Sequence, residues 1–257
     1  MTRTMVAILA AGIVAACGSG TTTCAIQASC GVGPPHTTLT VFAAASLQPP
    51  FDTIAAKLRS TQNIATTFSY AGTQTLTTQL TQGAPADVFA SADVAHMTTV
   101  QSAGLLHSPS VVFAHNRLEI TVAKGNPKGV HSLADLARSG LVVVLADPSV
   151  PAGKYAAQAL AKAGVTVHPA SLEQQVTGVL SKVALGEADA GIVYHSDIVT
   201  SAQVDGVVIP DTQNVIADYP IAVLAGAQNQ AGAVTFVDFV LSTEGQSILT
   251  SAGFQGA

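Results

Sequence analysis

Residues 38–103 read TLTVFAAASLQPPFDTIAAKLRSTQNIATTFSYAGTQTLTTQLTQGAPADVFASADVAHMTTVQSA. Short apolar runs alternate here with longer segments of helical character. The apolar runs predict strands at 39–43, 64–69 and 87–90, and the segments between and after them predict helices at 51–58, 75–82 and 94–103. This alternation favours an α/β fold with largely parallel strands.

The same alternation restarts after Asn116. Further strands are expected at 118–123, 141–146, 190–193, 207–209 and 221–224. Further helices are expected at 152–163, 176–185, 233–241 and 244–252, together with one that starts at 132–135. Ser132 stands at the N-cap of that helix and Asp135 at the capping-box position. Two cycles of strands and helices predict two α/β lobes.

The composition excludes several classes of protein. Hydrophobic residues make up 48% of the 257 residues, but they are spread in short blocks and the longest strongly apolar run, 5–16, falls short of the roughly 20 residues that span a bilayer. Only ten residues are basic and they do not cluster, so we expect no binding to nucleic acid. The net charge of −5 does not exclude an anionic ligand, because neutral N–H and O–H donors in a closed pocket can hold one.

The N-terminus is typical of a secretory signal. Arg3 precedes the apolar run, and the small residues Val14-Ala15-Ala16 lead to Cys17, Gly18 and Ser19. A cysteine at this point resembles a bacterial lipobox, in which the signal, here residues 1–16, is removed and Cys17 carries the lipid. The alternative is an ordinary signal peptide with an incidental cysteine. Lipidation would place the protein outside the cell membrane and anchored to it.

Residues 17–37 are expected to be the lipidated cysteine and a flexible linker, because the segment is rich in Gly, Ser, Thr and Pro. Cys24 and Cys30 lie within it. In an oxidising compartment they could form a disulfide that closes a small loop, or they could stay unpaired. No neighbouring motif supplies further metal ligands.

Several turns place small or hydroxyl-bearing residues between a strand and a helix. Such positions expose free backbone N–H groups at the positive end of a helix dipole, which suits an anion, and they lie at the usual ligand crevice of α/β sheets. The turns are 42–47, 70–76, 146–155, 176–179 and 191–197. Ser46 is a candidate N-cap and ligand donor, and Pro49 and Pro50 fit only a first helical turn.

Charged residues near these turns have simpler interpretations. Lys154 is expected to be a solvated lysine on a helix face, and His195 to lie at the surface or behind the site. Asp147 and Asp197 are expected to cap or orient their loops. No cluster of His, Tyr or carboxylate residues predicts a metal coordinated by side chains.

Five stretches occur in a fixed order: AAASL (43–47), GAPADVFASAD (83–93), DPSVPAGKYA (147–156), GEADAGIVYHSD (186–197) and YPIAV (219–223). Together they resemble the molybdate-binding proteins of ABC transporters, from about residue 39 to the C-terminus. The resemblance implies a periplasmic-binding-protein-like class II fold in which two lobes, joined by two crossover strands, close over one oxyanion. Lobe I would comprise residues 38–115 plus 219–257, and lobe II residues 116–218.

The resemblance also implies a ligand set and a role. The anion, molybdate or tungstate, would be held by Ser46, Thr73, Ala152, Val176 and Tyr194 through hydroxyl and backbone N–H groups. Thr73 departs from the serine usual in the family but keeps a hydroxyl, and Gly72 and Gln74 differ from the serine-rich version too. The implied protein is a monomer without cofactor or catalytic activity that delivers its ligand to ABC permease subunits.

Three alternatives remain open at the level of sequence. A binding protein for another ligand, such as sulfate, phosphate, an iron carrier or an organic acid, could share the fold. An α/β hydrolase would need a G-x-S-x-G nucleophile elbow, which the sequence lacks. The sensing module of a regulator would not carry a lipobox.

Overall fold

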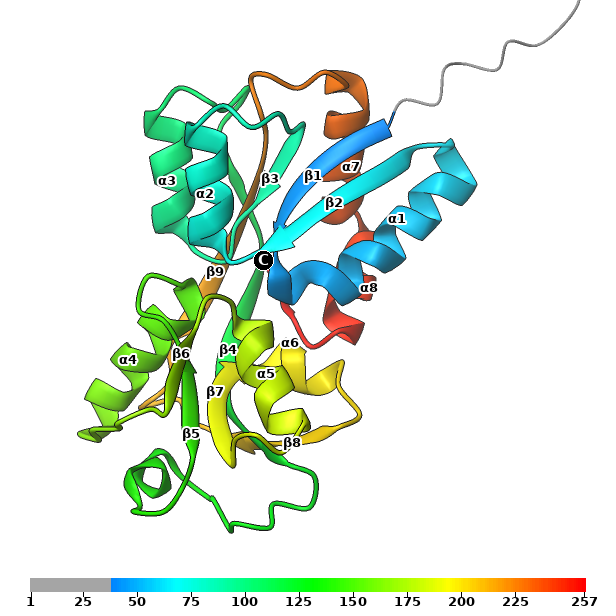
Figure 1. The fold of residues 1–257 in the computed structure, drawn as a ribbon. Helices are drawn as coiled ribbons and strands as arrows, with labels where there is room; N and C mark the ends of the chain where they lie inside the picture. Colours follow the sequence, from blue (N-terminus) through cyan, green and yellow to red (C-terminus); the bar gives the residue numbers. More distant parts are fainter. Residues whose placement is uncertain (1–37) are drawn as a thin grey trace, which may run out of the picture. The chain divides into compact units, whose positions relative to one another are not determined.

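The computed structural model describes residues 38–257, and the expected signal peptide, lipidation site, linker and cysteines lie outside this range. The described chain forms one α/β unit with ten strands (Figure 1). The strands are β1 (Thr38–Ala44), β2 (Ala65–Ala71), β3 (Val88–Ala90), β4 (Val111–Ala123), β5 (Val143–Ala146), β6 (Ser171–Glu173), β7 (Ala190–Tyr194), β8 (Val204–Val208), β9 (Ile216–Val223) and β10 (Gln255–Gly256). The predicted α/β alternation is confirmed.

The helices follow the strands in alternation. They are α1 (Gln48–Gln62), α2 (Thr73–Thr81), α3 (Val94–Ser102), α4 (Pro151–Ala163), α5 (Val176–Ala184), α6 (His195–Val199), α7 (Gln230–Leu241) and α8 (Thr243–Ser251), with short 3₁₀ turns η1 (Ala45–Leu47) and η2 (Leu133–Ala137). The helix expected to start at 132–135 is therefore a 3₁₀ turn, and Asp135 accepts a hydrogen bond from the Ser132 N–H (2.9 Å) as the capping box requires.

The long strand β4 connects two groups of strands. The sheet order is β2-β1-β3-β9-β4-β7-β5-β6, with β8 and β10 also paired to β4. In the first group β2, β1 and β3 run parallel and β9 returns antiparallel to β3; in the second group β5, β6 and β7 run parallel. Strand β4 pairs antiparallel with β9 along its first half and with β7 and β8 along its second half.

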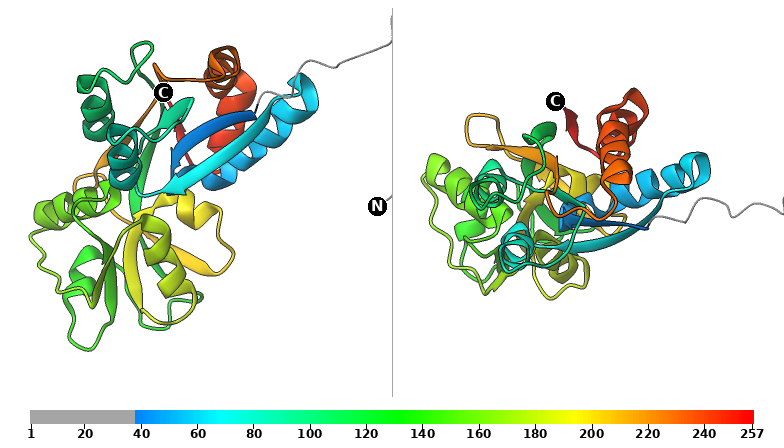
Figure 2. Two further views of the ribbon diagram at one scale, coloured as in Figure 1. Left: turned by 45° about the horizontal axis from the view of Figure 1, so that its top comes forward. Right: turned by 90° about the horizontal axis from the view of Figure 1, so that it is seen from above.

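Helices cover both faces of each group. Around the first group α1, α7 and α8 pack together on one side, and α2 and α3 pack together on the other (Figures 1 and 2). Around the second group α4 and α5 pack on β5 and β7, while α6 lies against β4. No helix within residues 38–257 is long and apolar enough to cross a membrane.

An aromatic cluster links the core of the first group to the centre of the molecule. The Phe51 ring lies 5.4 Å from that of Phe236 and 5.9 Å from that of Phe113. Phe113 then meets Tyr219 edge-on at 6.4 Å, and Tyr219 meets Tyr194 at 5.8 Å. Such tilted and T-shaped contacts are favoured by the ring quadrupoles and lie in a close-packed interior. The cluster fixes the position of Tyr194, which ends β7.

Candidate functional site

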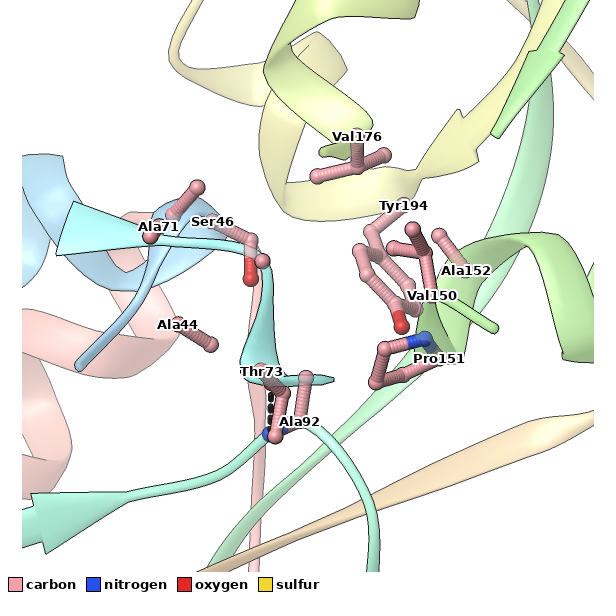
Figure 3. Close-up of a pocket in the computed structure, with 12 residues that line it drawn as sticks. Ala44, Ser46, Ala71, Thr73, Ala92, Val150, Pro151, Ala152, Val176 and Tyr194 are labelled. Atoms are coloured by element: carbon pink, nitrogen blue, oxygen red, sulfur yellow. Dashed lines mark hydrogen bonds between the residues drawn. The ribbon is translucent and has the colours of Figure 1, made fainter. Parts of the chain in front are cut away.

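The five residues that the resemblance implied lie around one cavity (Figure 3). Ser46, Thr73, Ala152, Val176 and Tyr194 all line it, although they come from segments far apart in the chain. The other lining residues are Ala44, Ala45, Ala71, Gly72, Ala92, Val150 and Pro151. No lining residue has an ionisable acid or base other than the Tyr194 phenol. The cavity is narrow: the centre of a water-sized sphere can occupy only about 10 Å³ within it.

Three helices begin at this cavity. Thr73 is the first residue of α2, Pro151 the first of α4 and Val176 the first of α5. The first N–H groups of a helix have no acceptor within the helix, and the aligned peptide dipoles give that end a partial positive charge. Three such ends beside one cavity favour an anion without any charged side chain.

The turn before α4 depends on a glycine. A Cβ atom on Gly153 would lie 2.1 Å from the carbonyl oxygen of Asp147 and 2.4 Å from that of Ala146, so no larger residue fits there. Asp147 accepts hydrogen bonds from the N–H (2.9 Å) and hydroxyl (2.7 Å) of Ser149, and these bonds lower the pKa of its carboxyl. The prediction that Asp147 orients its loop is confirmed.

Ser46 does not cap helix α1, contrary to the sequence-based expectation. The 3₁₀ turn η1 separates β1 from α1, so that Leu47 becomes the N-cap and makes no side-chain capping bond. Pro49 and Pro50 lie in the first turn of α1, as expected. Freed from capping, the buried Ser46 hydroxyl lies 3.0 Å from the Tyr219 hydroxyl and points into the central space.

Thr73 keeps its hydroxyl proton available. Its side chain is 1% exposed, and Oγ1 accepts a hydrogen bond from the Ala92 N–H (3.2 Å), the dashed line in Figure 3. A hydroxyl that accepts at a lone pair retains one proton to donate. The threonine at this position therefore keeps the donor that the usual serine would supply.

Tyr194 carries the least satisfied polar group of the site. Its side chain is 1% exposed, and Oη has no hydrogen-bond partner within residues 38–257. Burial, reinforced by the neighbouring tyrosines, raises the pKa of this phenol well above its usual value, so it stays protonated and can donate. An unpaired buried hydroxyl costs about 1–3 kcal/mol, which makes its retention at a cavity wall a mark of function.

Asp197 lies behind Tyr194 and orients its loop, as expected. Its Oδ2 accepts a hydrogen bond from the Tyr194 N–H (3.0 Å). The carboxyl is 4% exposed and has no ion pair within the described part of the chain. Burial raises the pKa of Asp197 to about 7, although the bond from Tyr194 opposes this.

Tyr219 is the residue that the sequence-based reasoning missed. It does not line the cavity, but it is fully buried behind it on β9 and contacts both Ser46 and the Tyr194 ring. The stretch YPIAV was recognised as part of the resemblance, but the phenol partner of Ser46 lies 173 positions away in sequence. That distance hides the contact from any local pattern.

Charged residues near the cavity are paired outside it. His195 lies at the edge of the site with Nδ1 2.9 Å from Glu119 Oε1, in agreement with the expectation. Lys154 is exposed on the face of α4, as expected: its side chain is 45% exposed, and Nζ lies 4.0 Å from Oδ2 of the buried Asp93. Burial raises the pKa of Asp93, but hydrogen bonds from His96 outweigh it and bring the pKa below its usual value. Residues 38–257 contain no cluster of three or more potential metal ligands.

Two contacts join the walls of the cavity at its rim. Gln74 Nε2, on α2, donates to the carbonyl oxygen of Gln174, just before α5 (2.8 Å). Gly72 lies beneath this contact, and a Cβ there would be 2.4 Å from the same carbonyl oxygen. Because the φ of Gly72 is −58°, its backbone suits any residue and only the close approach requires glycine. The ion pair of Lys154 with Asp93 is the second contact.

Comparison with known proteins identifies the family. The model of the bacterial extracellular solute-binding protein family matches residues 39–255. A relative from Mycobacterium tuberculosis H37Rv named molybdate-binding protein ModA is 44% identical over 252 residues, covering 96% of this chain and 94% of the relative.

Solved structures show the same fold. The periplasmic molybdate-binding protein of Azotobacter vinelandii aligns with a TM-score of 0.73 at 20% identity, covering 84% of this chain and 98% of that one. The sulfate-binding protein SubI of Mycobacterium tuberculosis H37Rv aligns with a TM-score of 0.79 at 20% identity, covering 86% and 88%. The predicted periplasmic-binding-protein fold is confirmed, and the chain belongs to the bacterial extracellular solute-binding proteins, within the ModA family.

Proposed function

We propose that this protein binds molybdate outside the cytoplasm and delivers it to an ABC importer. The observation that carries the proposal is the cavity where three helices begin and where the buried Tyr194 presents a hydroxyl without a partner among residues 38–257. The family relatives named for molybdate support the choice of ligand. The same donors would accept tungstate, which has the same shape and charge.

The ligand contacts come from Ser46, Thr73 and Tyr194 through hydroxyls, and from Ala152 and Val176 through backbone N–H groups. A tetrahedral dianion has four oxygens, and burying it is costly unless each oxygen is satisfied. Hydrogen bonds to a charged group in a dry site are individually stronger than those in water. Neutral donors suffice because several converge on one small space.

Closure of two lobes would complete the site. The proposed lobe I, residues 38–115 plus 219–257, supplies Ser46 and Thr73, and the proposed lobe II, residues 116–218, supplies the other three ligands. The proposed boundaries fall within β4 and β9, where His115 pairs in register with Asp218. A ligand that bonds to both lobes stabilises the closed form because it has no such contacts in an open one. The Gln74–Gln174 bond is a direct contact between the proposed lobes.

Selectivity would follow from size and from protonation. Molybdate and tungstate are larger than sulfate, so a pocket fitted to them leaves the smaller ion with overlong bonds. A protonated phosphate needs an acceptor, and the cavity walls carry no carboxylate. The same lack of a general base beside the hydroxyls supports binding without catalysis.

Location and partners complete the proposal. Cys17, which lies outside the described residues, would carry a lipid that anchors the monomer to the outer side of the cell membrane. The loaded closed form would then meet the ABC permease subunits.

Calorimetry and thermal unfolding test the proposal directly. Purified protein is titrated with molybdate, tungstate, sulfate, phosphate and chromate, since a tight ligand raises the melting temperature. We expect molybdate and tungstate to bind at micromolar concentration or below and the other ions to bind at least 100-fold more weakly. Retention of sulfate without molybdate would overturn the assignment and favour the sulfate-binding alternative.

A further inference from the structure

A pair of buried hydroxyls lies behind the cavity wall. Ser46 Oγ and Tyr219 Oη are 3.0 Å apart, and either oxygen could donate the bond. Ser46 is 4% exposed and Tyr219 is fully buried. Of the two, only Ser46 lines the cavity, so the Tyr219 hydroxyl would act on a ligand through Ser46, whereas the Tyr219 ring also contacts Tyr194.

The direction of this bond decides what Ser46 offers to a ligand. A serine hydroxyl has one proton and two lone pairs. If Ser46 donates to Tyr219, it turns a lone pair toward the cavity, which repels an anion. If Tyr219 donates to Ser46, the Ser46 proton is free to point into the cavity.

The ordinary acidity of the two groups favours donation by Tyr219. Burial raises the pKa of the Tyr219 phenol, so its proton remains on the oxygen and both hydroxyls are able to donate. A phenol is a stronger acid than an alcohol and hence the better donor of the two. Polarisation along a chain from Tyr219 through Ser46 to an anion strengthens each bond.

The Tyr219 ring is held in a fixed orientation. It meets Phe254 edge-on at 5.3 Å, Phe113 at 6.4 Å and Tyr194 at 5.8 Å. On β9 it pairs in register with Ala114 of β4. A phenol held by three rings and a strand can direct its hydroxyl without reorganisation when the ligand arrives.

We propose that Tyr219 is a positioning residue for ligand binding: its hydroxyl donates to Ser46 Oγ and so directs the Ser46 proton at the bound anion. This inference rests on the proposed function, because it needs an anion in the cavity. In this proposal Tyr219 on β9 sets the direction of the Ser46 hydroxyl and does not itself contact the ligand.

A double-mutant cycle tests the proposal with molybdate as the probe. Tyr219→Phe removes the hydroxyl and keeps the ring, Ser46→Ala removes the proposed relay, and the double variant combines both. Calorimetry should give about 10-fold weaker molybdate binding for Tyr219→Phe. The double variant should bind no more weakly than Ser46→Ala, because Tyr219 would act only through Ser46. Equal affinity of Tyr219→Phe and wild type, or additive losses in the double variant, would overturn it.

Controls separate this proposal from the proposed function and from misfolding. Tyr70→Phe is the matched control, since the Tyr70 hydroxyl donates to Asp52 (2.8 Å) away from the cavity and its removal should leave affinity unchanged. Wild-type protein that ignores molybdate would contradict the proposed function, whereas tight wild-type binding with an unaltered Tyr219→Phe would contradict only the inference. Should Tyr219→Phe lose its folded circular dichroism, proton NMR of wild type and Ser46→Ala decides: a protected Tyr219 hydroxyl signal must shift on loss of Ser46, and an unmoved signal overturns the proposal.

Discussion

Polar groups are arranged differently at the cavity and along β4, the strand that connects the two groups of strands. At the cavity, hydroxyls and helix N-termini are buried beside no charged side chain, and the Tyr194 hydroxyl has no partner in the described chain. Along β4, in contrast, buried Glu119 pairs with His195 (2.9 Å) and lies 3.8 Å from Arg117, and His115 pairs with Asp218 (2.7 Å). Charges are thus paired where strands cross, and neutral donors are left available where a ligand would bind.

The comparison shows two uses of buried polarity. A buried charge is tolerable only when it is paired and hydrogen-bonded, and such a pair then helps to fix one arrangement of the strands. A donor left unpaired lowers stability, but it keeps its bonding capacity for a ligand. Changing one region at a time should therefore separate affinity from stability.

A negative charge placed in the cavity should have the largest effect. Thr73→Asp would set a carboxylate against the bound dianion, and two unit charges 4 Å apart repel by about 4 kcal/mol at an effective dielectric constant near 20. We expect at least 1000-fold weaker molybdate binding by calorimetry. Circular dichroism should check that the variant folds, because an unpaired carboxylate at a position that is 1% exposed lowers stability, and the positive N-terminal end of α2 offsets only part of that cost.

Thr73→Asn is the matched control, with the same shape and no charge. Its affinity should fall by no more than about 10-fold, the scale of one altered hydrogen bond. Similar losses in both variants would mean that shape rather than charge decides binding at this position, so the lack of charged side chains at the cavity would not explain anion binding.

The next effect concerns Asp197, the buried carboxylate between the two regions. Its pKa of about 7 lies above the unfolded value, so between about pH 4 and pH 7 the folded protein holds a proton that the unfolded chain has released. The free energy of unfolding therefore loses up to about 4 kcal/mol from this group as the pH rises through that range. Asp197→Asn should remove that part of the pH dependence, measured by urea unfolding from pH 4 to pH 8.

Asp205→Asn is a comparison variant, because Asp205 should affect the pH dependence of the free energy of unfolding with the opposite sign. Asp205 is partly exposed and pairs with Lys124 (2.7 Å), and its hydrogen bonds lower its pKa. Its contribution to stability should be small, present above pH 4 and lost as the pH falls through the lowered pKa. Identical pH profiles for wild type and Asp197→Asn would show that the buried carboxyl is not raised.

Loss of the unpaired hydroxyl should have an intermediate effect. Tyr194→Phe removes one bond to a charged ligand, worth about 1.5–3 kcal/mol, so calorimetry should show about 10- to 100-fold weaker molybdate binding. The melting temperature without ligand should stay equal or rise, because an unsatisfied buried group is removed. A lower melting temperature with unchanged molybdate affinity would show that the Tyr194 hydroxyl stabilises the fold and does not bind the ligand.

The smallest effect on molybdate binding is expected from the charged pairs along β4. Glu119→Gln keeps the shape but removes the charge opposite His195, and it should lower the free energy of unfolding by about 1–2 kcal/mol in urea. Molybdate affinity should remain within about twofold of wild type. Glu187→Gln, at an exposed position, should change neither quantity. A large loss of molybdate affinity in Glu119→Gln alone would show that the Glu119 pair also contributes to ligand binding.

Sequence patterns predict those helices and strands that are marked by neighbouring residues, such as an apolar run or a glycine that ends a helix. Helix α4 ends one residue before Gly164, whose φ of +66° is the left-handed cap that favours glycine, and β1 matches its apolar run to within one residue at each end. Strand β4 was predicted only at 118–123, whereas it begins at Val111. Its first half contains Asn116, which is buried because its Nδ2 donates to Ser196 Oγ (2.8 Å), 80 positions away.

The missed elements and the missed site residue share one cause. Strand β6 has only three residues, with Leu172 46% exposed, and α6 has five, so neither carries a periodic pattern. The ligand set was found through the resemblance, and the structure places all five residues at one cavity. Tyr219 needed the tertiary contact with Ser46, which only the folded chain provides.

The lack of a side chain at Gly72 allows the start of α2 to approach the Gln174 carbonyl oxygen closely. With the Gln174 carbonyl so close, even a methyl group there would act as a wedge between α2 and the segment before α5. Enlarging this one position step by step, from alanine to valine, would yield a graded series of proteins in which these two segments are forced apart by increasing side-chain volume. Such a series would measure how far the proposed molybdate affinity depends on their close approach.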